Sequence, residues 1–328
     1  MAAVRRLMPD SYAVILSARA NSERLPGKCL SELAPGVTVL GQLFDRWRTS
    51  DRAPTVILAT PAEPCNDPLA AVAAAHGIPV SRLPPGNAVA EMDAAVRQFA
   101  PGAKFVARAL ADNPLVDIGL ADWRLDVLAE TGAEGLWYGG DHDRITYCGT
   151  TDVWNRAAWD RIAAESSGCQ LAHPGALYWD KLSTFNVVQL PLPRREFVDS
   201  FRTELDTPLD LEVFRAVWAA WGDSGKADLQ WAAGMPYVKV ADGPPALWAL
   251  RWLAAHPQVS GLNAAVRVKT QTRAAFGLRE KAWLCEGCRQ RVGSIKEGNL
   301  QVYCPGCGRP KKFFAVRPRG KVDMGWVP

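Results

Sequence analysis

The sequence has no apolar run long enough to cross a membrane or to act as a secretory signal. Arg5 and Arg6 stand near the N-terminus, but Pro9 and Asp10 interrupt the stretch after them, and the apolar run amounts to little more than Ala13 to Leu16. A membrane span needs about 20 apolar residues, and even the core of a signal peptide needs about seven or more. We therefore expect a cytoplasmic protein with no membrane partner.

Internal repeats, low-complexity tracts and the glycine spacings of a Walker A loop or a dinucleotide-binding fingerprint are also absent. The chain has 328 residues, 48% of them apolar, which suffices for one large domain and one small one. We expect a large α/β domain over 1–222, a helical extension or linker over 223–275, and a small basic domain over 276–328. The sequence assigns no role to the middle segment.

Charge is distributed unevenly along the chain. From Ala265 onward there are 14 Lys and Arg against 4 Asp and Glu, a balance of +10, so with a net charge of +4 the first 264 residues carry −6. A basic tail of this kind suits a polyanionic partner. The alternative is a soluble appendage that has no such partner.

Three short apolar runs are predicted to be buried parallel strands. They are Ser11 to Ser17, Thr55 to Thr60 and Lys104 to Leu110, each bounded by loops and separated from the next by helix-like stretches. A later strand is expected over 183–190, and helices are expected over 88–99, 119–130 and 155–165. The alternation predicts an α/β fold with a mainly parallel sheet.

Residues typical of helix ends predict where two further helices begin or end. Asp67 is expected to cap a helix whose first residue is Pro68, and Gly77 is expected to end it. Thr207 followed by Pro208 predicts another helix start. Apolar residues then recur at helical spacing and should face the core, namely Leu211, Phe214, Val217, Trp218 and Trp221.

The first predicted strand leads directly into a loop with three cations and a glycine. The loop runs from Ala18 to Lys28 and includes Arg19, Arg24 and Gly27. Arginine forks onto phosphate oxygens, and glycine lets backbone amides approach closely. After a strand of an α/β sheet, this composition predicts a polyanion site. A solvated surface turn is the alternative.

The string SARANSERLPGKCL, at residues 17–30, resembles the signature opening of the cytidylyltransferase family that activates acidic sugars as CMP derivatives. The similarity is greatest to the spore-coat polysaccharide type. It implies a Rossmann-like, GT-A-like nucleotide-diphosphosugar transferase fold whose loop holds the triphosphate of CTP. The nucleotide-binding residues that it implies are Ala18, Arg19, Ser22, Arg24, Gly27 and Lys28, of which Arg19, Arg24 and Lys28 are also assigned catalytic roles.

Three further segments resemble the family in the same order along the chain. Ala59-Thr60 with Asn66-Asp67-Pro68-Leu69 is similar to its second strand and the helix start after it. Ala111 to Asp117 resembles its acidic Asp-x-Pro-Leu segment, and Leu205 to Leu211 resembles its Leu-Asp-Thr-Pro-Glu-Asp-Leu run. The matching segments span about two thirds of the chain.

Two carboxylates are candidate ligands for Mg²⁺. Asp112 follows a predicted strand, and Asp206 precedes a predicted helix cap. Mg²⁺ prefers oxygen ligands and bridges phosphate oxygens, and the family resemblance implies that both residues bind the metal and that Asp112 is catalytic. The alternatives are local: Asp112 would cap a turn before Asn113, and Asp206 would serve the helix after it.

The acceptor region departs from the family pattern. Asp152 is assigned to the substrate site by its resemblance to a segment near the sugar acceptor. His173 stands at about the expected distance beyond it, but in an Ala-His-Pro-Gly context where the family has Glu-His-Val-Thr. A structural histidine is therefore favoured.

Four cysteines near the C-terminus have the spacing of a structural zinc site. Cys285, Cys288, Cys304 and Cys307 form two CxxC pairs separated by fifteen residues, which predicts a zinc ribbon with a tetrahedral Zn²⁺ ion. Disulfides or idle thiols are the alternative. The other four cysteines lack such spacing and are expected to be buried small hydrophobes, namely Cys29, Cys65, Cys148 and Cys169.

Basic and aromatic residues surround the four cysteines of the predicted ribbon. They suit a nucleic acid, or they are the ribbon's own packing and its solvated surface. The leading hypothesis for the whole chain is a cytidylyltransferase that uses a nucleoside triphosphate, Mg²⁺ and a sugar-type acceptor. The second hypothesis is a glycosyltransferase that spends a nucleotide-sugar on a bound nucleic acid, and the third is a binding module without turnover. The sequence leaves open whether the chain is a monomer or a homodimer.

Overall fold

The structure is a computed structural model that describes residues 11–138, 152–190, 201–222, 243–264 and 266, and the backbone of five short strands between 282 and 316. The strands up to residue 190 are β1 (Tyr12–Ser17), β2 (Glu32–Ala34), β3 (Val37–Thr38), β4 (Thr55–Pro61), β5 (Val80–Leu83), β6 (Phe105–Leu110), β7 (Gly135–Tyr138), β8 (Asp152–Asn155) and β9 (Val187–Leu190). The helices are α1 (Val39–Trp47), α2 (Asp67–Ala75), α3 (Ala88–Phe99), α4 (Ile118–Thr131), α5 (Arg156–Glu165), α6 (Ala176–Asp180), α7 (Pro208–Ala220), α8 (Ala246–Ala255) and α9 (Pro257–Ser260). Among the described helices, none is both long and apolar enough to cross a membrane.

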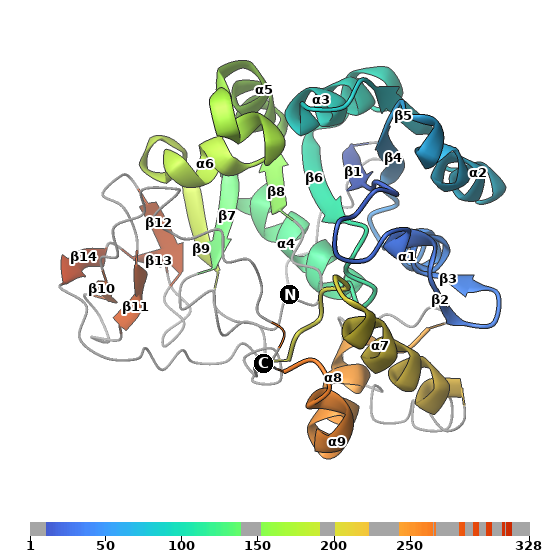
Figure 1. The fold of residues 1–328 in the computed structure, drawn as a ribbon. Coiled ribbons are helices and arrows are strands. Elements are labelled where there is room, and N and C mark those ends of the chain that lie inside the picture. Colours follow the sequence, from blue (N-terminus) through green and yellow to red (C-terminus); the bar gives the residue numbers. More distant parts are fainter. Residues whose placement is uncertain are drawn as a thin grey trace.

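The order of strands in the sheet reverses beside β1. From β1 the chain moves outward through β4 to β5 and then returns to β6 on the other side of β1, which gives the order β6-β1-β4-β5. All three pairings are parallel (Figure 1). In such sheets ligands bind beyond the carboxyl ends of the strands at the point of reversal. The loop after β1 and the segment after β6 therefore meet at the edge where a ligand is expected.

β8 enters the sheet in the opposite direction, next to β6. Its register pairs Asp152 with Arg108, so the start of β8 lies near the carboxyl end of β6. β7 and β9 continue the sheet beyond β8 and are parallel to each other. The α/β fold with a mainly parallel sheet is thus confirmed, and the antiparallel strand brings Asp152 to the ligand edge.

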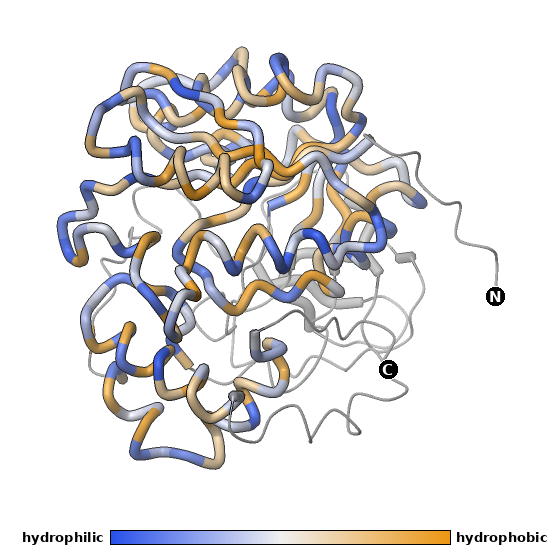
Figure 2. The backbone as a smooth tube through the Cα atoms, turned by 90° about the vertical axis from the view of Figure 1, so that its right-hand side faces the viewer, coloured by the Kyte–Doolittle hydropathy of each residue, from blue (hydrophilic) through white to orange (hydrophobic). Residues whose placement is uncertain are grey.

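Side chains of β1 alternate between two hydrophobic cores, one on each face of the sheet. Val14 and Leu16 face a core that α1, α4, α7 and α8 cover, whereas Ala13 and Ile15 face a core that α3, α5 and α6 cover. All four side chains are fully buried. Figure 2 shows apolar stretches running through the interior, with polar stretches in the outer turns. The rigid centre of the sheet therefore carries the loops at its edge.

Most elements predicted from the sequence are present. The three central strands and their parallel pairing are confirmed, and α3 has the predicted bounds. Thr207 caps α7 as predicted, since its Oγ1 accepts a hydrogen bond from the backbone N–H of Asp210. The apolar residues expected on the inner side of α7 are buried.

Three predictions about local structure are wrong. Asp67 is the first residue of α2 and does not cap it, and Asn66, which precedes the helix, does not cap it with its side chain either. The strand expected over 183–190 starts only at Val187, because Leu182–Thr184 forms a 3₁₀ helix. Cys65 and Cys169 are exposed rather than buried, whereas Cys29 is buried as expected; Cys148 lies outside the described residues.

Five strands of the C-terminal segment are described by their backbone. β10 (Ala282–Cys285) pairs with β11 (Arg291–Ser294) and β14 (Phe313–Val316) in an antiparallel sheet. β12 (Leu300–Tyr303) pairs in parallel with β9 and so extends the main sheet, and β13 (Pro310–Lys311) pairs with β12. Cys288, Cys304, Cys307 and the side chain of Cys285 lie outside the described residues. The zinc ribbon and its nucleic-acid partner therefore stay predictions, as do the domain boundaries.

Candidate active site

The loop after β1 is closed on itself by backbone hydrogen bonds. Gly27 has a φ of 70°, a left-handed conformation that favours glycine. Its N–H donates to the carbonyl of Ala20 at 2.8 Å. The N–H of Ala20 in turn donates to Oδ1 of Asn66 at 2.8 Å, and Asn66 is fully buried between β4 and α2. The amide that fails to cap α2 therefore holds the loop, a role that sequence reasoning did not assign to it.

Lys28 extends from the end of this loop to two carboxylates that are distant in sequence. Its Nζ lies 2.7 Å from Oδ2 of Asp112 and 2.9 Å from Oδ1 of Asp206. Burial lowers the pKa of the Lys28 ammonium, but Asp112 and Asp206 outweigh burial and raise that pKa above its ordinary value. The ammonium is therefore charged at neutral pH. The neighbouring Cys29 anchors the chain here, and burial raises the pKa of its thiol to about 12.

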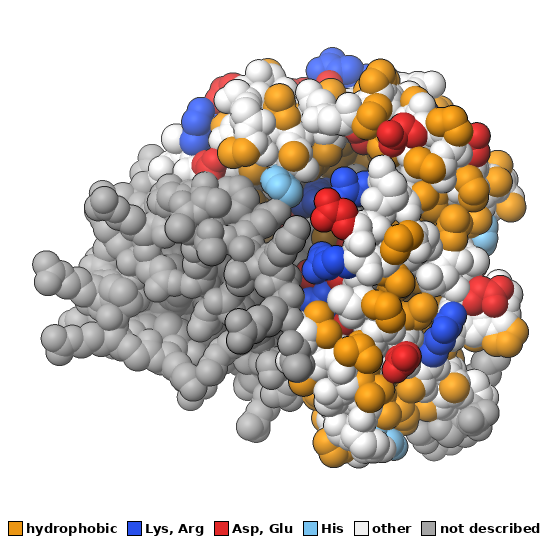
Figure 3. All heavy atoms as spheres, viewed as in Figure 1, with side chains coloured by type: hydrophobic (Ala, Val, Ile, Leu, Met, Phe, Trp, Pro, Cys, Tyr) orange, Lys and Arg blue, Asp and Glu red, His pale blue; other side chains and the backbone are white. Residues whose placement is uncertain are grey.

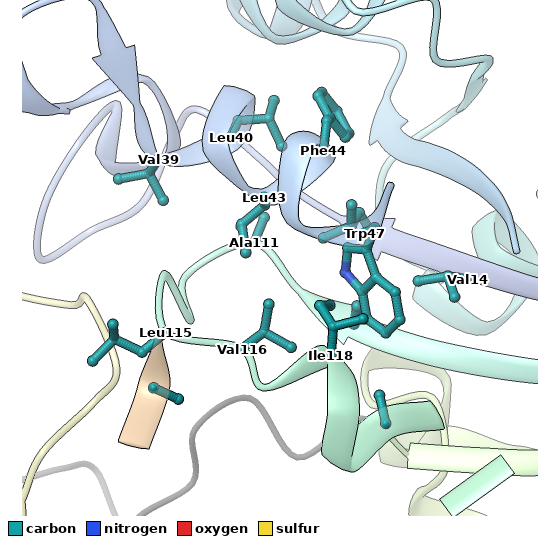
Figure 4. Packing of buried hydrophobic residues seen from close by; sticks show 14 of the residues in the cluster. Val14, Val39, Leu40, Leu43, Phe44, Trp47, Ala111, Leu115, Val116 and Ile118 are labelled. Atoms are coloured by element: carbon teal, nitrogen blue, oxygen red, sulfur yellow. The ribbon is translucent and has the colours of Figure 1, made fainter. Parts of the chain in front are cut away.

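Asp112 follows β6 on a segment that hydrophobic side chains hold in place. Leu115, Val116 and Ile118 are buried in the core that includes Leu43 on α1. Figure 4 shows these side chains facing α1 from the segment after β6. The carbonyl of Asp112 accepts a hydrogen bond from the N–H of Leu205 at 2.8 Å. That bond brings the segment before α7 alongside the segment after β6.

Asp206 is only 5% exposed and contacts three cations. Besides Lys28, Nη2 of Arg24 lies 2.8 Å and Nη2 of Arg202 2.9 Å from Oδ2 of Asp206. Burial raises the pKa of Asp206, but the three cations outweigh it and hold that pKa below its ordinary value. Because Thr207 caps α7, Asp206 does not serve the helix. The local alternative for Asp206 is therefore wrong.

Sequence reasoning missed two residues of this cluster. Arg202 stands four residues before Asp206, and that spacing is the one signal that pairs the two in the sequence. Glu204 is the second missed residue. Burial raises the pKa of its carboxyl, and the nearby charges of Asp112 and Asp206 raise it further. The cluster thus contains more acidic groups than the two that motif resemblance identifies.

A second charged cluster lies at the start of β8. Oδ2 of Asp152 is 3.8 Å from Nη1 of Arg108, which also donates to the carbonyl of Pro174 at 3.4 Å. Nε of Arg108 is buried and has no hydrogen-bond partner among the described residues. Burial raises the pKa of Asp152 even though Arg108 and Arg124 oppose the shift. The cluster therefore holds a guanidinium whose hydrogen-bonding capacity is partly unused.

The charge of Arg19 acts on His173 and on Glu91. Burial raises the pKa of Glu91, and the charge of Arg19 opposes that shift. Burial lowers the pKa of His173, and the charges of Arg108 and Arg19 lower it further. Arg19 is exposed, and Ser22 is half-buried. Of the three cations in the loop, Arg24 and Lys28 contact Asp206. Figure 3 shows acidic and basic side chains of the described residues gathered in a hollow near the centre of this face.

Residues 13–150 match the family model for cytidylyltransferases. This segment, which makes up less than half of the chain, is similar to that family. It contains the loop after β1, Lys28 and Asp112, and it ends before Asp152 and Asp206. The expected class of enzyme, a cytidylyltransferase, is thereby confirmed at the level of the family. No curated protein matches the chain.

Several solved structures are similar to this chain. A cytidylyltransferase from Leptospira borgpetersenii serovar Hardjo-bovis is similar at 17% identity, with a TM-score of 0.63, over 79% of this chain and 99% of the other. A CMP:2-keto-3-deoxy-manno-octonic acid synthetase complexed with CTP has 13% identity and a TM-score of 0.48, over 64% and 99%. Rv0371C of Mycobacterium tuberculosis, in complex with manganese, has 19% identity and a TM-score of 0.41, over 57% and 92%. The first of these shows the nucleotidyltransferase-like fold.

Proposed function

We propose that the protein transfers CMP from CTP to a sugar or sugar acid and releases pyrophosphate. An oxygen of the acceptor attacks the α-phosphorus, the bond between that phosphorus and the bridging oxygen of the β-phosphate breaks, and the acceptor's proton passes to solvent. The observation that carries the proposal is the contact of Lys28 with both Asp112 and Asp206 at the ligand edge of the sheet. This arrangement places a cation from the loop and two acidic segments around one point.

The loop residues would bind the triphosphate. Arg24 is 39% exposed on its side chain, so its guanidinium has room for phosphate oxygens beside its contact with Asp206. Gly27 adopts a left-handed conformation, which turns the backbone so that the end of the loop meets its beginning. Ala18 and Ser22 belong to the same closed loop and would complete the phosphate cradle. Positive charge held in place before the reaction stabilises the charge that develops on pyrophosphate.

Asp112 and Asp206 would hold a divalent metal ion. One ammonium contacts an oxygen of each carboxylate within 2.9 Å, so the two are close enough to share a cation. The described residues contain no group of three or more His, Cys, Asp and Glu placed to hold a metal. Mg²⁺ is commonly bound by one or two carboxylates, with waters and substrate phosphates completing its six ligands. The pair therefore fits Mg²⁺, which when bound would neutralise phosphate charge and orient the triphosphate.

Lys28 would exchange partners during nucleotide binding. Its ammonium contacts the same carboxylate oxygens that a metal ion would need, so the two cations compete for them. An ammonium displaced from the carboxylates carries its charge to the phosphates, for which lysine is a compact partner. Lys28 would thus neutralise the two acids before the nucleotide arrives and the triphosphate afterwards.

The second cluster would bind the acceptor. Nε of Arg108, which is buried and has no partner within the described part of the chain, suits an oxygen-rich ligand, and Asp152 beside it suits a hydroxyl. Both lie at the same sheet edge as the loop, because β8 is antiparallel to β6. A glycosyltransferase, the second hypothesis from the sequence, has no support from the family match.

Incubation with CTP, Mg²⁺ and a panel of sugars and sugar acids, assayed for pyrophosphate, tests the proposal. We expect acceptor-dependent release of pyrophosphate, and we expect Lys28→Ala to abolish most of it. Lys104→Ala is the matched control, since Lys104 is exposed and precedes β6 at the opposite edge of the sheet. Consumption of a nucleotide-sugar without pyrophosphate from any nucleoside triphosphate would contradict the proposal.

A further inference from the structure

The segment after α9, which sequence reasoning could not connect to any function, reaches the candidate active site through one side chain. Asn263 is 3% exposed, and its Nδ2 donates a hydrogen bond of 2.9 Å to Oδ1 of Asp210 on α7. Asp210 is fully buried. A carboxylate without exposure to water needs each of its partners, because a lost hydrogen bond leaves a buried acceptor unsatisfied. Asn263 is therefore part of what keeps Asp210 in place.

Asp210 holds Asp206 in two ways. Its Oδ2 accepts a hydrogen bond of 3.0 Å from the backbone N–H of Asp206, which fixes the chain at that residue. Its Oδ1 accepts from Nε of Arg202 at 2.8 Å, and Nη2 of the same guanidinium donates to Oδ2 of Asp206 at 2.9 Å. The planar guanidinium of Arg202 thus bridges two carboxylates, a geometry that the point charge of lysine does not reproduce.

We infer that Asn263, Asp210 and Arg202 form a positioning relay that orients the carboxylate of Asp206 toward the metal ion. The inference rests on the proposed function, because it assigns to Asp206 the role of a metal ligand. The three are positioning residues, because they act on the site through Asp206. The relay gives the segment beyond α9 a part in the site. Asn263 supplies one of the hydrogen bonds to the buried Asp210, and Asp210 in turn holds Arg202 and Asp206.

The relay differs from ordinary packing in what it predicts. Loss of a residue that only stabilises the fold lowers the unfolding temperature and leaves the affinity of the folded fraction for metal unchanged. Loss of a partner that orients a metal ligand typically costs about 10- to 100-fold in metal affinity or activity. Metal affinity measured on folded protein therefore separates the two roles.

Binding of Mn²⁺ in the presence of CTP, monitored by electron spin resonance, tests the relay on the full chain without requiring turnover. We expect Arg202→Lys to weaken Mn²⁺ binding by about tenfold or more, and Asn263→Ala by a smaller factor of about three to ten. Gln258→Ala is the matched control, since Gln258 is exposed on α9, and it should bind like the wild type. Circular dichroism at the assay temperature establishes that each variant is folded.

The double variant decides whether Asn263 acts through Arg202. Because the two residues share Asp210, we expect Asn263→Ala to add little to the effect of Arg202→Lys, a non-additive result. Independent, additive losses would overturn the relay, and so would wild-type Mn²⁺ affinity in folded Asn263→Ala. Where Asn263→Ala fails to fold, the similarly sized Asn263→Leu replaces it, since it removes the donor without leaving a cavity, and an unchanged affinity in that variant has the same meaning.

The same measurement keeps the relay and the proposed function apart. Absence of Mn²⁺ binding in the wild type, with or without CTP, would refute the metal site and the relay that depends on it. Wild-type binding together with unchanged binding in the relay variants would overturn the relay alone and leave the proposed function intact.

Discussion

The two charged clusters at the ligand edge of the sheet differ in how completely their charges are paired. In the first cluster, Asp206 contacts three cations and its pKa is lowered. In the second cluster, Asp152 faces Arg108 at 3.8 Å, its pKa is raised by burial, and Nε of Arg108 lacks a partner among the described residues. The carboxylate of Asp206 is thus stabilised by close contacts, whereas that of Asp152 is not. Each cluster keeps one buried guanidinium nitrogen without a hydrogen-bond partner among the described residues, Nη1 of Arg202 in the first and Nε of Arg108 in the second.

The largest effect is expected from removing the central charge of the first cluster. Asp206→Asn removes the charge that Arg24, Lys28 and Arg202 share, although Lys28 keeps Asp112 and Arg202 keeps Asp210 as a partner. Breaking a buried ion pair costs about 3 kcal/mol. We expect the free energy of unfolding in urea to fall by about this amount, and Mn²⁺ binding to be lost. A variant as stable as the wild type would show that the pairing in this cluster contributes nothing to the fold.

A smaller effect is expected from replacing Lys28, which should strengthen the binding of metal and weaken the binding of nucleotide. Lys28→Ala removes the cation that occupies Oδ2 of Asp112 and Oδ1 of Asp206. Mn²⁺ binding without nucleotide should therefore tighten about tenfold, or about 1.4 kcal/mol. The affinity for CTP should fall by a similar factor or more, because a charged hydrogen bond to phosphate is lost. Lys104→Ala should change neither. Weaker Mn²⁺ binding in Lys28→Ala would contradict competition between the two cations.

Neutralising Asp152 in the second cluster should affect the free energy of unfolding in the opposite way from neutralising Asp206 in the first. Because burial raises the pKa of Asp152, its ionised form is held at a cost in the folded protein. Asp152→Asn should therefore leave the free energy of unfolding at pH 7 unchanged or higher, while it raises the KM for the acceptor and spares the KM for CTP. A loss of stability comparable to that of Asp206→Asn would remove the distinction between the clusters.

The effects of the two neutralising substitutions on stability should depend on pH in opposite directions. The folded pKa of Asp206 is lowered, so its contribution to stability is present above its unfolded pKa of about 3.9 and is lost as the pH falls through the folded value. The folded pKa of Asp152 is raised, so Asp152→Asn should become more stable relative to the wild type as the pH rises from about 4 through the folded value. Urea unfolding of both variants between pH 3 and 7 measures the two trends, and parallel curves would refute the assigned directions.

Much of the fold could be predicted from local patterns in the sequence. The central strands are short apolar runs, and the start of α7 has a threonine cap next to Pro208, so neighbouring residues alone specify them. α1 was not predicted, although Leu40, Leu43 and Phe44 are fully buried there. β7 and β8 were not predicted as strands either, because each has four residues and takes its place through pairing with distant strands.

The candidate site was predicted in part for the same reason. Motif resemblance identified Lys28, Asp112 and Asp206, and the structure brings the three together. It did not identify Asn66 or Arg202, whose roles depend on side chains that contact other segments. Their types, an amide and a guanidinium, are common throughout the chain and carry no signal of their own.

The alternation of strands and helices, the cations of the loop after β1 and the acidic segments all follow from residues that are neighbours in the chain. How the charges are shared depends on contacts between distant segments, which the fold sets. The reversal of strand order beside β1 brings together the loop after β1 and the segment after β6, so that Lys28 lies between Asp112 and Asp206. Packing of α9 against α7 places Asn263 against Asp210. Charges pair according to distance in space, and that distance is set by how the sheet is assembled.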